Sequence, residues 1–184
     1  NRQIDPGCFN FKRHWRHSMA TALCAEALAG KMKCSRDAAF AAGLMHDIGQ
    51  LFLPISFPGH QEAVTKHCIQ FDCCAYEAER AVLGTDHACI GRILTEKWNF
   101  PAALSEAVGW HHEPEKASAG SLACVLHLAD CIVHGLDLAG AEYEQVPPVN
   151  ASCWNAANLS WADSQALFIK VESGLETLCN ELAI

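Results

Sequence analysis

The most apolar segment of the sequence, residues 121–136 (SLACVLHLADCIVHGL), carries an aspartate near its middle. The segment is long enough for about four helical turns and has the composition of a helix that is buried on all sides. A carboxylate in such a helix is costly unless it is hydrogen-bonded, paired with a positive charge or bound to a metal ion. Any fold of this chain must therefore provide a polar partner or a metal ion for Asp130.

Helical patterns continue through most of the chain. Residues 13–32 are rich in Ala and Leu, contain no proline and predict one long helix. Ser35 can cap the next helix, which we expect to run to about Gly49. Further helices are expected near residues 60–70, 74–83, 86–99, 101–112 and 161–183, with Thr85, Pro101 and Ser160 at three of their starts.

Two stretches interrupt the helical pattern. Pro54 predicts a loop, and residues 139–158, with two adjacent prolines, predict an irregular connection before the C-terminal helix. No alternating strand pattern of useful length occurs. We therefore expect an all-α, multi-helix fold in which residues 1–184 form a single domain and residues 139–184 supply an irregular connection plus the last helix. Because the sequence starts almost inside its first helix, we also expect a fragment of a longer protein.

The composition indicates a compact, folded domain and disfavours two kinds of partner. Hydrophobic residues make up 51% of the chain and charged residues 18%, which is typical of globular proteins. A net charge of −8 repels the nucleic-acid backbone, so we expect no nonspecific DNA or RNA binding. No uncharged apolar run of about 18 residues and no signal-peptide core is present, so we expect no membrane span and a cytoplasmic protein.

Eleven cysteines occur, an odd number, and no two have the C-x-x-C spacing of a zinc ribbon or redox motif. Several lie within apolar helical patterns, namely Cys24, Cys89, Cys124 and Cys131. We therefore expect most of the cysteines to be buried free thiols in a reducing compartment.

The dipeptide His46-Asp47 lies near the end of an apolar, alanine-rich helix, where both side chains need a partner or a metal ion. Neighbouring residues on a helix lie about 100° apart, so both can still reach one ion. Other candidate ligands lie on other predicted helices: His17, His87, His111, His112 and Asp130. A single core histidine is usually only hydrogen-bonded, but the set as a whole favours a metal cluster.

Imidazole and carboxylate groups together suit one or two ions of iron, manganese, zinc or nickel, and they do not distinguish sharply among these metals. We expect no ligand role for His60, His67 or His134. Glu79 and Asp86 are expected on a solvated face, and the alternative for Asp86 is to orient the imidazole that follows it.

The ordered set His17, His46-Asp47 and Asp130 resembles the H…HD…D signature of the HD superfamily. The stretches WRHSMATA, AAFAAGLMHDIGQL, DHACIGRILTEKWNFP, AVGWHHEP and LHLAD resemble its HDOD branch, the HD-related output domains of bacterial signalling proteins. The resemblance covers about residues 15–138. It implies an all-α fold with a metal site between the helices.

The sequence is also partly similar to the HD-GYP phosphodiesterases, which cleave cyclic dinucleotides at a site of two or three metal ions. That similarity implies one ion bound by His17, His46, Asp47 and Asp130, and a second bound by Asp47, His87, His111 and His112. Asp47 would then bridge the two ions, and in an active enzyme it would be the central catalytic ligand.

Three departures from the HD-GYP pattern bear on activity. Gln50 replaces the lysine of HD-x-G-K, and glutamine cannot donate a proton as lysine can. The chain reads HHEPEKASAG where a G-Y-P element is expected. Arg13, which cannot bind a metal ion, replaces an acidic residue one turn before His17.

The resemblance therefore implies two functions. The first is a metal-binding regulatory or output domain in bacterial signal transduction, with other signalling domains or proteins as partners and a nucleotide or phosphate-containing molecule as a ligand. The second is a metal-dependent phosphohydrolase that acts on nucleotides or cyclic (di)nucleotides. A helical scaffold with a vestigial site is a third interpretation, which the nearly complete ligand set disfavours.

Overall fold

The computed structural model describes residues 9–117, 121–140 and 145–182, and these residues form helices and connecting turns with no strand among them. The expected all-α fold is therefore confirmed. The α-helices are α1 (Phe11–Ala29), α2 (Arg36–Met45), α3 (Leu53–Ser56), α4 (His60–Phe71), α5 (Ala75–Leu83), α6 (His87–Lys97), α7 (Ala102–Trp110), α8 (Ser121–Gly135), α9 (Ala151–Ala157) and α10 (Trp161–Leu182). Two 3₁₀-helices, η1 (Ile48–Leu51) and η2 (Pro114–Lys116), follow α2 and α7.

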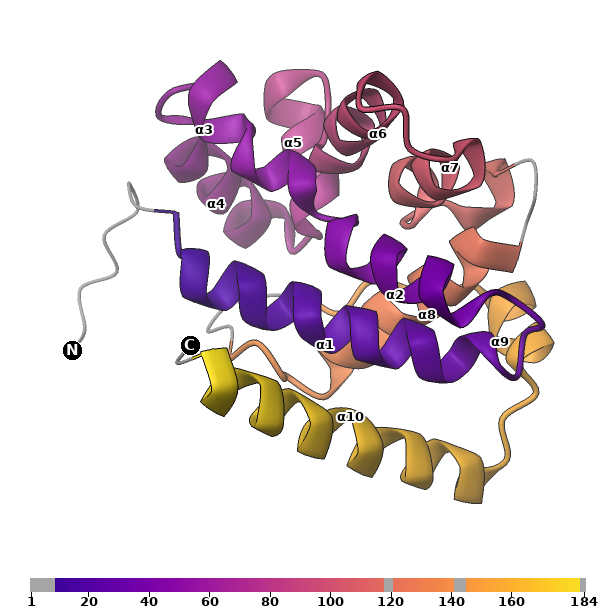
Figure 1. Ribbon diagram of the computed structural model, residues 1–184. Helices are drawn as coiled ribbons and strands as arrows, with labels where there is room; N and C mark the ends of the chain where they lie inside the picture. The colour runs from indigo at the N-terminus through magenta and orange to yellow at the C-terminus, as the bar shows by residue number, and fades with distance from the viewer. Residues whose placement is uncertain (1–8, 118–120, 141–144, 183–184) are drawn as a thin grey trace.

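Helices α1, α8 and α10 form the main hydrophobic core. α1 and α10 run antiparallel and side by side, and α8 packs against α1 from behind (Figure 1). Leu28, Leu128 and Leu175, one from each helix, are at most 1% exposed. Replacing a leucine buried in this way with alanine typically costs about 2–5 kcal/mol, so this core contributes strongly to the stability of the domain.

Helix α2 joins this core to the group formed by α3 to α7, which lies on the other side of the molecule in Figure 1. A Cβ atom added at Gly43 would lie 2.5 Å from Cα of Ala22, so α1 and α2 touch backbone to backbone. A Cβ atom added at Gly49 would overlap the carbonyl oxygen of His87, so η1 lies directly on the start of α6. These two close contacts draw the polar residues of α1, α2 and α6 together.

Two residues predicted as helix caps act as caps. Ser35 accepts a hydrogen bond from a backbone N–H at the start of α2, and Ser160 accepts one from Asp163 at the start of α10. The helix that follows Ser35 ends at Met45 and not near Gly49. It ends early because the chain must turn to bring Gly49 onto α6.

Three expectations of local structure were wrong. α6 is capped by Asp86, whose side chain accepts a hydrogen bond from a backbone N–H of the helix, and not by Thr85. The loop expected at Pro54 contains the four-residue helix α3. Within the expected irregular connection, Asn150 caps the helix α9 by accepting a hydrogen bond from the backbone N–H of Cys153. Residues 141–144 of that connection lie outside the described residues.

The expectation of free thiols was wrong for Cys124. Cys124 on α8 and Cys153 on α9 form a disulfide with a Cα–Cα distance of 5.1 Å, which ties α9 to the core. Cys24 and Cys131 are buried free thiols as expected, whereas Cys89 is exposed.

One segment, Arg36–Ser56, is long and apolar enough to cross a membrane by length and composition. In the structure it comprises α2, η1 and α3, and it carries the buried side chains of His46 and Asp47. Core helices of soluble proteins pass the same test, so a single segment of this kind is weak evidence for a membrane span.

Candidate metal centre

All seven predicted ligands lie in one buried cluster between the helices. They come from α1 (His17), the turn between α2 and η1 (His46 and Asp47), the start of α6 (His87), the end of α7 (His111 and His112) and the middle of α8 (Asp130). Each of these side chains is at most 8% exposed. The fold therefore brings together every polar residue that the sequence singled out for this site.

His46 and His111 end their helices in the same way. Nδ1 of His46 lies 2.8 Å from the carbonyl oxygen of Gly43, and Nδ1 of His111 lies 2.7 Å from that of Val108. A carbonyl oxygen only accepts hydrogen bonds, so Nδ1 carries the proton in each ring and Nε2 is the nitrogen available to a metal ion. These hydrogen bonds also satisfy carbonyl groups that a helix leaves without partners at its C-terminal end.

His87 is held by Glu79, which we expected to be solvated. Oε2 of Glu79 accepts hydrogen bonds from Nδ1 of His87 at 2.7 Å and from the backbone N–H of His87 at 2.8 Å. Glu79 is only 5% exposed, and Asp86 is buried as well and pairs with Arg80. The expectation of a solvated face was therefore wrong for both carboxylates, and Glu79, not Asp86, orients the imidazole.

Asp47 lies between two groups of histidines. Its Oδ2 atom is 3.3 Å from Nε2 of His46 and 3.8 Å from Nε2 of His17. Its Oδ1 atom is 3.2 Å from Nε2 of His87 and 3.9 Å from Nε2 of His111. Each carboxylate oxygen thus faces a different pair of imidazoles, which is the arrangement that a ligand shared by two ions needs.

Asp130 lies next to three imidazoles. Its Oδ1 atom is 3.1 Å from Nε2 of His17, 3.2 Å from Nε2 of His134 and 3.6 Å from Nε2 of His46. Its Oδ2 atom has no hydrogen-bond partner, and Nδ1 of His112, 3.9 Å away, has none either. The sequence analysis expected no ligand role for His134, and the structure places its imidazole beside Asp130, one helical turn earlier on α8.

The candidate ligand atoms of the cluster cannot all form hydrogen bonds with one another, and their arrangement suits a cation. Nε2 of His17 lies 3.1 Å from Nε2 of His46, and Nε2 of His87 lies 2.9 Å from Nε2 of His112. Two such nitrogens share one proton at most, and Nε2 of His111 has no hydrogen-bond partner at all. Three sets of side chains offer ligand atoms within 4.8 Å of one another: His87, His111 and His112; His17, His46 and Asp47; His17, Asp130 and His134. Nitrogen and carboxylate ligands at this spacing fit a divalent metal ion.

The charges in the cluster also favour a cation. Burial alone lowers the pKa of His46, but the carboxylates of Asp47 and Asp130 outweigh burial and raise that pKa. Burial likewise opposes protonation of His87, yet Glu79 and Asp47 raise its pKa to about 10. Protons on these two imidazoles therefore balance the carboxylates in the metal-free protein. A divalent cation would have to displace them, so its binding would release protons.

His111 and His112 differ from these two imidazoles because they stay neutral. Burial is the main cause that lowers the pKa of His111 to about 4, and the nearby His46 adds to it. Burial and the neighbouring His111 lower the pKa of His112 well below 6.5. At pH 7 both rings therefore offer nitrogen lone pairs without first losing a proton.

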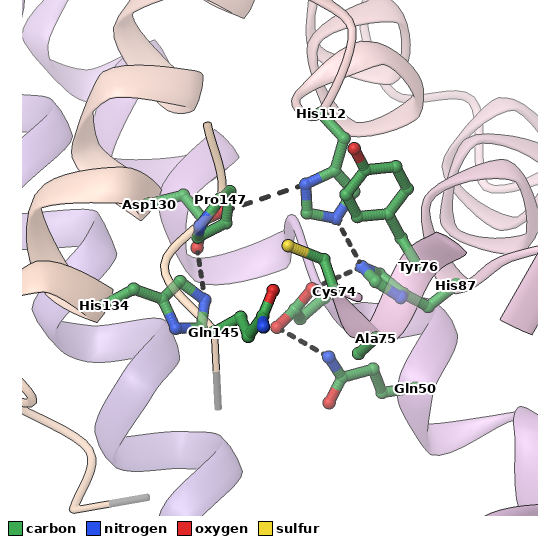
Figure 2. Close-up of a pocket in the computed structure, with 11 residues that line it drawn as sticks. Gln50, Cys74, Ala75, Tyr76, His87, His112, Asp130, His134, Gln145 and Pro147 are labelled. Carbon is green, nitrogen blue, oxygen red and sulfur yellow. Dashed lines mark hydrogen bonds and ion pairs between the residues drawn. The ribbon is translucent and has the colours of Figure 1, made fainter. Parts of the chain in front are cut away.

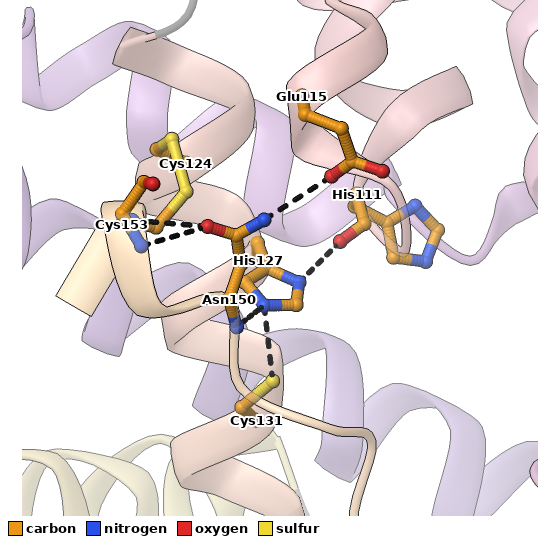
Figure 3. The surroundings of a disulfide bond; sticks show 8 residues. His111, Glu115, Cys124, His127, Cys131, Asn150 and Cys153 are labelled. Carbon is orange, nitrogen blue, oxygen red and sulfur yellow. Dashed lines mark hydrogen bonds between the residues drawn. A yellow bond between two sulfur atoms is a disulfide. The ribbon is translucent and has the colours of Figure 1, made fainter.

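His127 forms a hydrogen bond with the backbone of His111, as Figure 3 shows. Nδ1 of His127 donates a hydrogen bond to the carbonyl oxygen of His111 at 2.7 Å. Nε2 of His127 accepts one from the backbone N–H of Asn150 at 2.9 Å. The disulfide between Cys124 and Cys153 ties the segment around Asn150 to α8, so a covalent link stabilises one wall of the cluster.

A small pocket opens onto the cluster (Figure 2). His87, His112, Asp130 and His134 point into it, and Tyr76 stacks on His112 with ring centroids 4.2 Å apart. No lysine or arginine is among the described residues that line the pocket. A molecule about the size of water can therefore reach the cluster, and it meets no permanent positive side chain among these residues.

The fold and the ordered His, His-Asp and Asp set define the class of helical domains that the sequence resembles. The family model of the HDOD domain matches residues 1–114 of the 184 residues, so the chain belongs to the HDOD family. The match ends before α8, so Asp130 lies outside the matched segment. The structure places it beside the other residues of the cluster. A search of curated protein sequences found no significant match.

Solved structures with this fold come from several bacteria. A candidate signal transduction protein from Marinobacter aquaeolei VT8 is similar with a TM-score of 0.79 and 19% identity, over 99% of this chain and 41% of that chain. An HDOD domain protein of unknown function from Geobacter sulfurreducens has a TM-score of 0.73 and 18% identity, over 92% and 63%. A candidate phosphohydrolase from Shewanella amazonensis SB2B has a TM-score of 0.65 and 20% identity, over 95% and 67%. At these identities the likeness shows the fold, and the chain spans only part of each of these proteins.

Proposed function

We propose that this chain is a divalent-metal-binding regulatory or output domain of bacterial signal transduction. The observation that carries the proposal is the position of Asp47, whose two carboxylate oxygens face two separate groups of imidazoles. One or two ions of iron, manganese, zinc or nickel suit these ligands. The proposed ligands are His17, His46, Asp130 and Asp47 for one ion, and Asp47, His87, His111 and His112 for the other.

Two features of the site favour regulation over turnover. Nε2 of Gln50 donates a hydrogen bond to Oδ2 of Asp47 at 2.9 Å, at the position where an HD-GYP enzyme has a lysine. The pocket also lacks a described lysine or arginine that could stabilise the charge of a phosphoryl group. We therefore propose that a bound ion has a structural or sensing role. The proposed ligand is a nucleotide or another small phosphate-containing molecule, whose phosphate would face the bound ion and not a basic side chain.

The proposed partners are other signalling domains or proteins, in keeping with the signal transduction protein among the solved structures of this fold. The net charge of −8 disfavours nonspecific nucleic-acid binding. A cytoplasmic location is part of the same proposal.

A metal-dependent phosphohydrolase is the second candidate function, because the ligand set that two ions need is nearly complete. Bound cations would supply a water molecule of lowered pKa and stabilise charge on phosphoryl oxygens. One of the solved structures with this fold is a candidate phosphohydrolase. Asp47 would then be the shared, catalytic ligand.

Turnover by metal-loaded protein distinguishes the two functions. We would load the metal-free chain with iron, manganese, zinc, cobalt or nickel and assay phosphomonoesters, cyclic nucleotides and cyclic dinucleotides. Asp47→Asn serves as the inactive variant, and Asp37→Asn, an exposed position on α2, is the matched control. The regulatory proposal predicts bound metal without turnover. Turnover that Asp47→Asn abolishes and Asp37→Asn retains would contradict it and support the phosphohydrolase.

A further inference from the structure

His134 lies on α8 one helical turn after Asp130 and lines the pocket over the cluster (Figure 2). Its Nε2 atom is 3.2 Å from Oδ1 of Asp130, and its ring centroid is 4.6 Å from that of His17. The side chain of His134 is 13% exposed, whereas that of Asp130 is 1% exposed. His134 therefore lies at the entrance of the cluster, between the buried carboxylate and the solvent.

We propose that His134 is a further metal ligand, which completes the coordination of the ion held by His17, His46, Asp47 and Asp130. This inference rests on the proposed function, because it needs an ion in that half of the cluster. His17, Asp130 and His134 each offer a ligand atom within 4.8 Å of the other two. Ligand atoms that lie about 2.0–2.2 Å from a metal ion are about 3–4 Å apart, and the two N–O distances here are 3.1 Å and 3.2 Å.

Hydrogen bonds alone do not account for this arrangement. Oδ1 of Asp130 has the Nε2 atoms of His17, His134 and His46 within 3.6 Å. Nε2 of His17 also lies 3.1 Å from Nε2 of His46 and can carry only one proton, and Oδ2 of Asp130 has no hydrogen-bond partner. A cation among these atoms would bind the lone pairs of the imidazole nitrogens. Its positive charge would balance the negative charge of the carboxylates.

A ligand role for His134 also changes which metals the site prefers. With His134 this half of the cluster has three imidazoles and two carboxylates, and without it two imidazoles and two carboxylates. Imidazole suits cobalt, nickel, zinc and iron, whereas carboxylate suits manganese and magnesium. His134 should therefore increase the preference for cobalt over manganese.

The test compares His134→Ala and His134→Gln with the wild-type chain. The amide nitrogen of glutamine can still donate a hydrogen bond to Asp130, but glutamine is a poor ligand for these metals. Metal-free protein is titrated with Co²⁺ and Mn²⁺ in competition with a chromophoric chelator, and the visible absorption of bound Co²⁺ reports on its ligands. His67→Ala removes a histidine on α4 that belongs to none of the candidate metal groups and is the control. Circular dichroism confirms that each variant is folded.

We expect both His134 variants to bind Co²⁺ about 100-fold more weakly, at the upper end of the effect of losing a supporting group. The absorption spectrum of Co²⁺ should change, Mn²⁺ affinity should fall less, and His67→Ala should match the wild type. Wild-type affinity and an unchanged spectrum in His134→Gln would overturn the ligand role and leave a hydrogen-bonding role. If the wild-type chain itself binds no Co²⁺, the proposed function fails first, so the two failures are distinguishable.

Discussion

Glu79 offers a sharp test of how the cluster is built. Its Oε2 atom holds both Nδ1 and the backbone N–H of His87, at 2.7 Å and 2.8 Å, in a site where Glu79 is 5% exposed. Glu79→Ala removes this acceptor, so the imidazole of His87 is free to rotate away from Asp47. The buried N–H groups that lose their partner cost about 1–3 kcal/mol of stability.

The same substitution should weaken metal binding. Loss of a residue that orients a metal-binding histidine typically reduces affinity about 10- to 100-fold, which is about 1.4–2.8 kcal/mol. Glu79→Gln keeps an oxygen that accepts a hydrogen bond but loses the charge, so we expect an effect between those of the wild type and Glu79→Ala.

Chelator competition with Zn²⁺ or Co²⁺ gives the affinity, and urea denaturation of the metal-free protein gives the free energy of unfolding. Glu62→Ala, which removes an exposed carboxylate paired with Lys66 on α4, is the matched control and should leave metal affinity unchanged. Full metal affinity in Glu79→Ala would refute the reasoning, because it would mean that His87 either needs no orientation or does not bind the ion.

Three further predictions concern the surroundings of the cluster. Gly49→Ala places a methyl group on the carbonyl oxygen of His87, so it should lower the free energy of unfolding by about 1–3 kcal/mol and weaken metal binding; wild-type values in urea denaturation and metal titration would contradict this. Cys124→Ser opens the loop closed by Cys153 and should cost about 3–4 kcal/mol under oxidising conditions, with no difference from the wild type once both are reduced. Because the pKa values of His46 and His87 are raised, the latter to about 10, protons compete with the ion below those pKa values. Apparent metal affinity should therefore rise by about tenfold per pH unit for each displaced proton, and a flat profile between pH 6 and 9 would count against the cluster.

The candidate ligands could be predicted because their surroundings in the sequence are apolar. Asp130 lies within LHLADCIV and His46-Asp47 within GLMHDIGQ. The apolar neighbours predict that these polar side chains are buried. A buried charge needs a partner, and the candidate partners on the other predicted helices were histidines. Local signals of helix starts, such as Ser35 and Ser160, are similarly short-range.

Glu79 and His134 could not be assigned in the same way. Glu79 lies within YEAER, a charged stretch typical of a solvated face. It is buried because His87, at the start of α6, packs against it and donates hydrogen bonds to it. His134 lies near the end of its helix, so its sequence alone is equally consistent with an exposed residue. The helix α9 was missed because its local cap, Asn150, closely follows two adjacent prolines that predict a loop, and because the disulfide from Cys153 to α8 joins distant parts of the chain.

The most direct test of the account is the metal content of the purified chain, measured by elemental analysis after iron, manganese, zinc, nickel and cobalt have been offered and excess ions removed. Asp47→Asn and the matched variant Asp37→Asn are measured in parallel. We predict one or two equivalents in the wild type and in Asp37→Asn, and loss of the bound metal in Asp47→Asn, because Asp47 faces both groups of imidazoles. Absence of metal from the wild type, or metal retained in full by Asp47→Asn, would contradict the account.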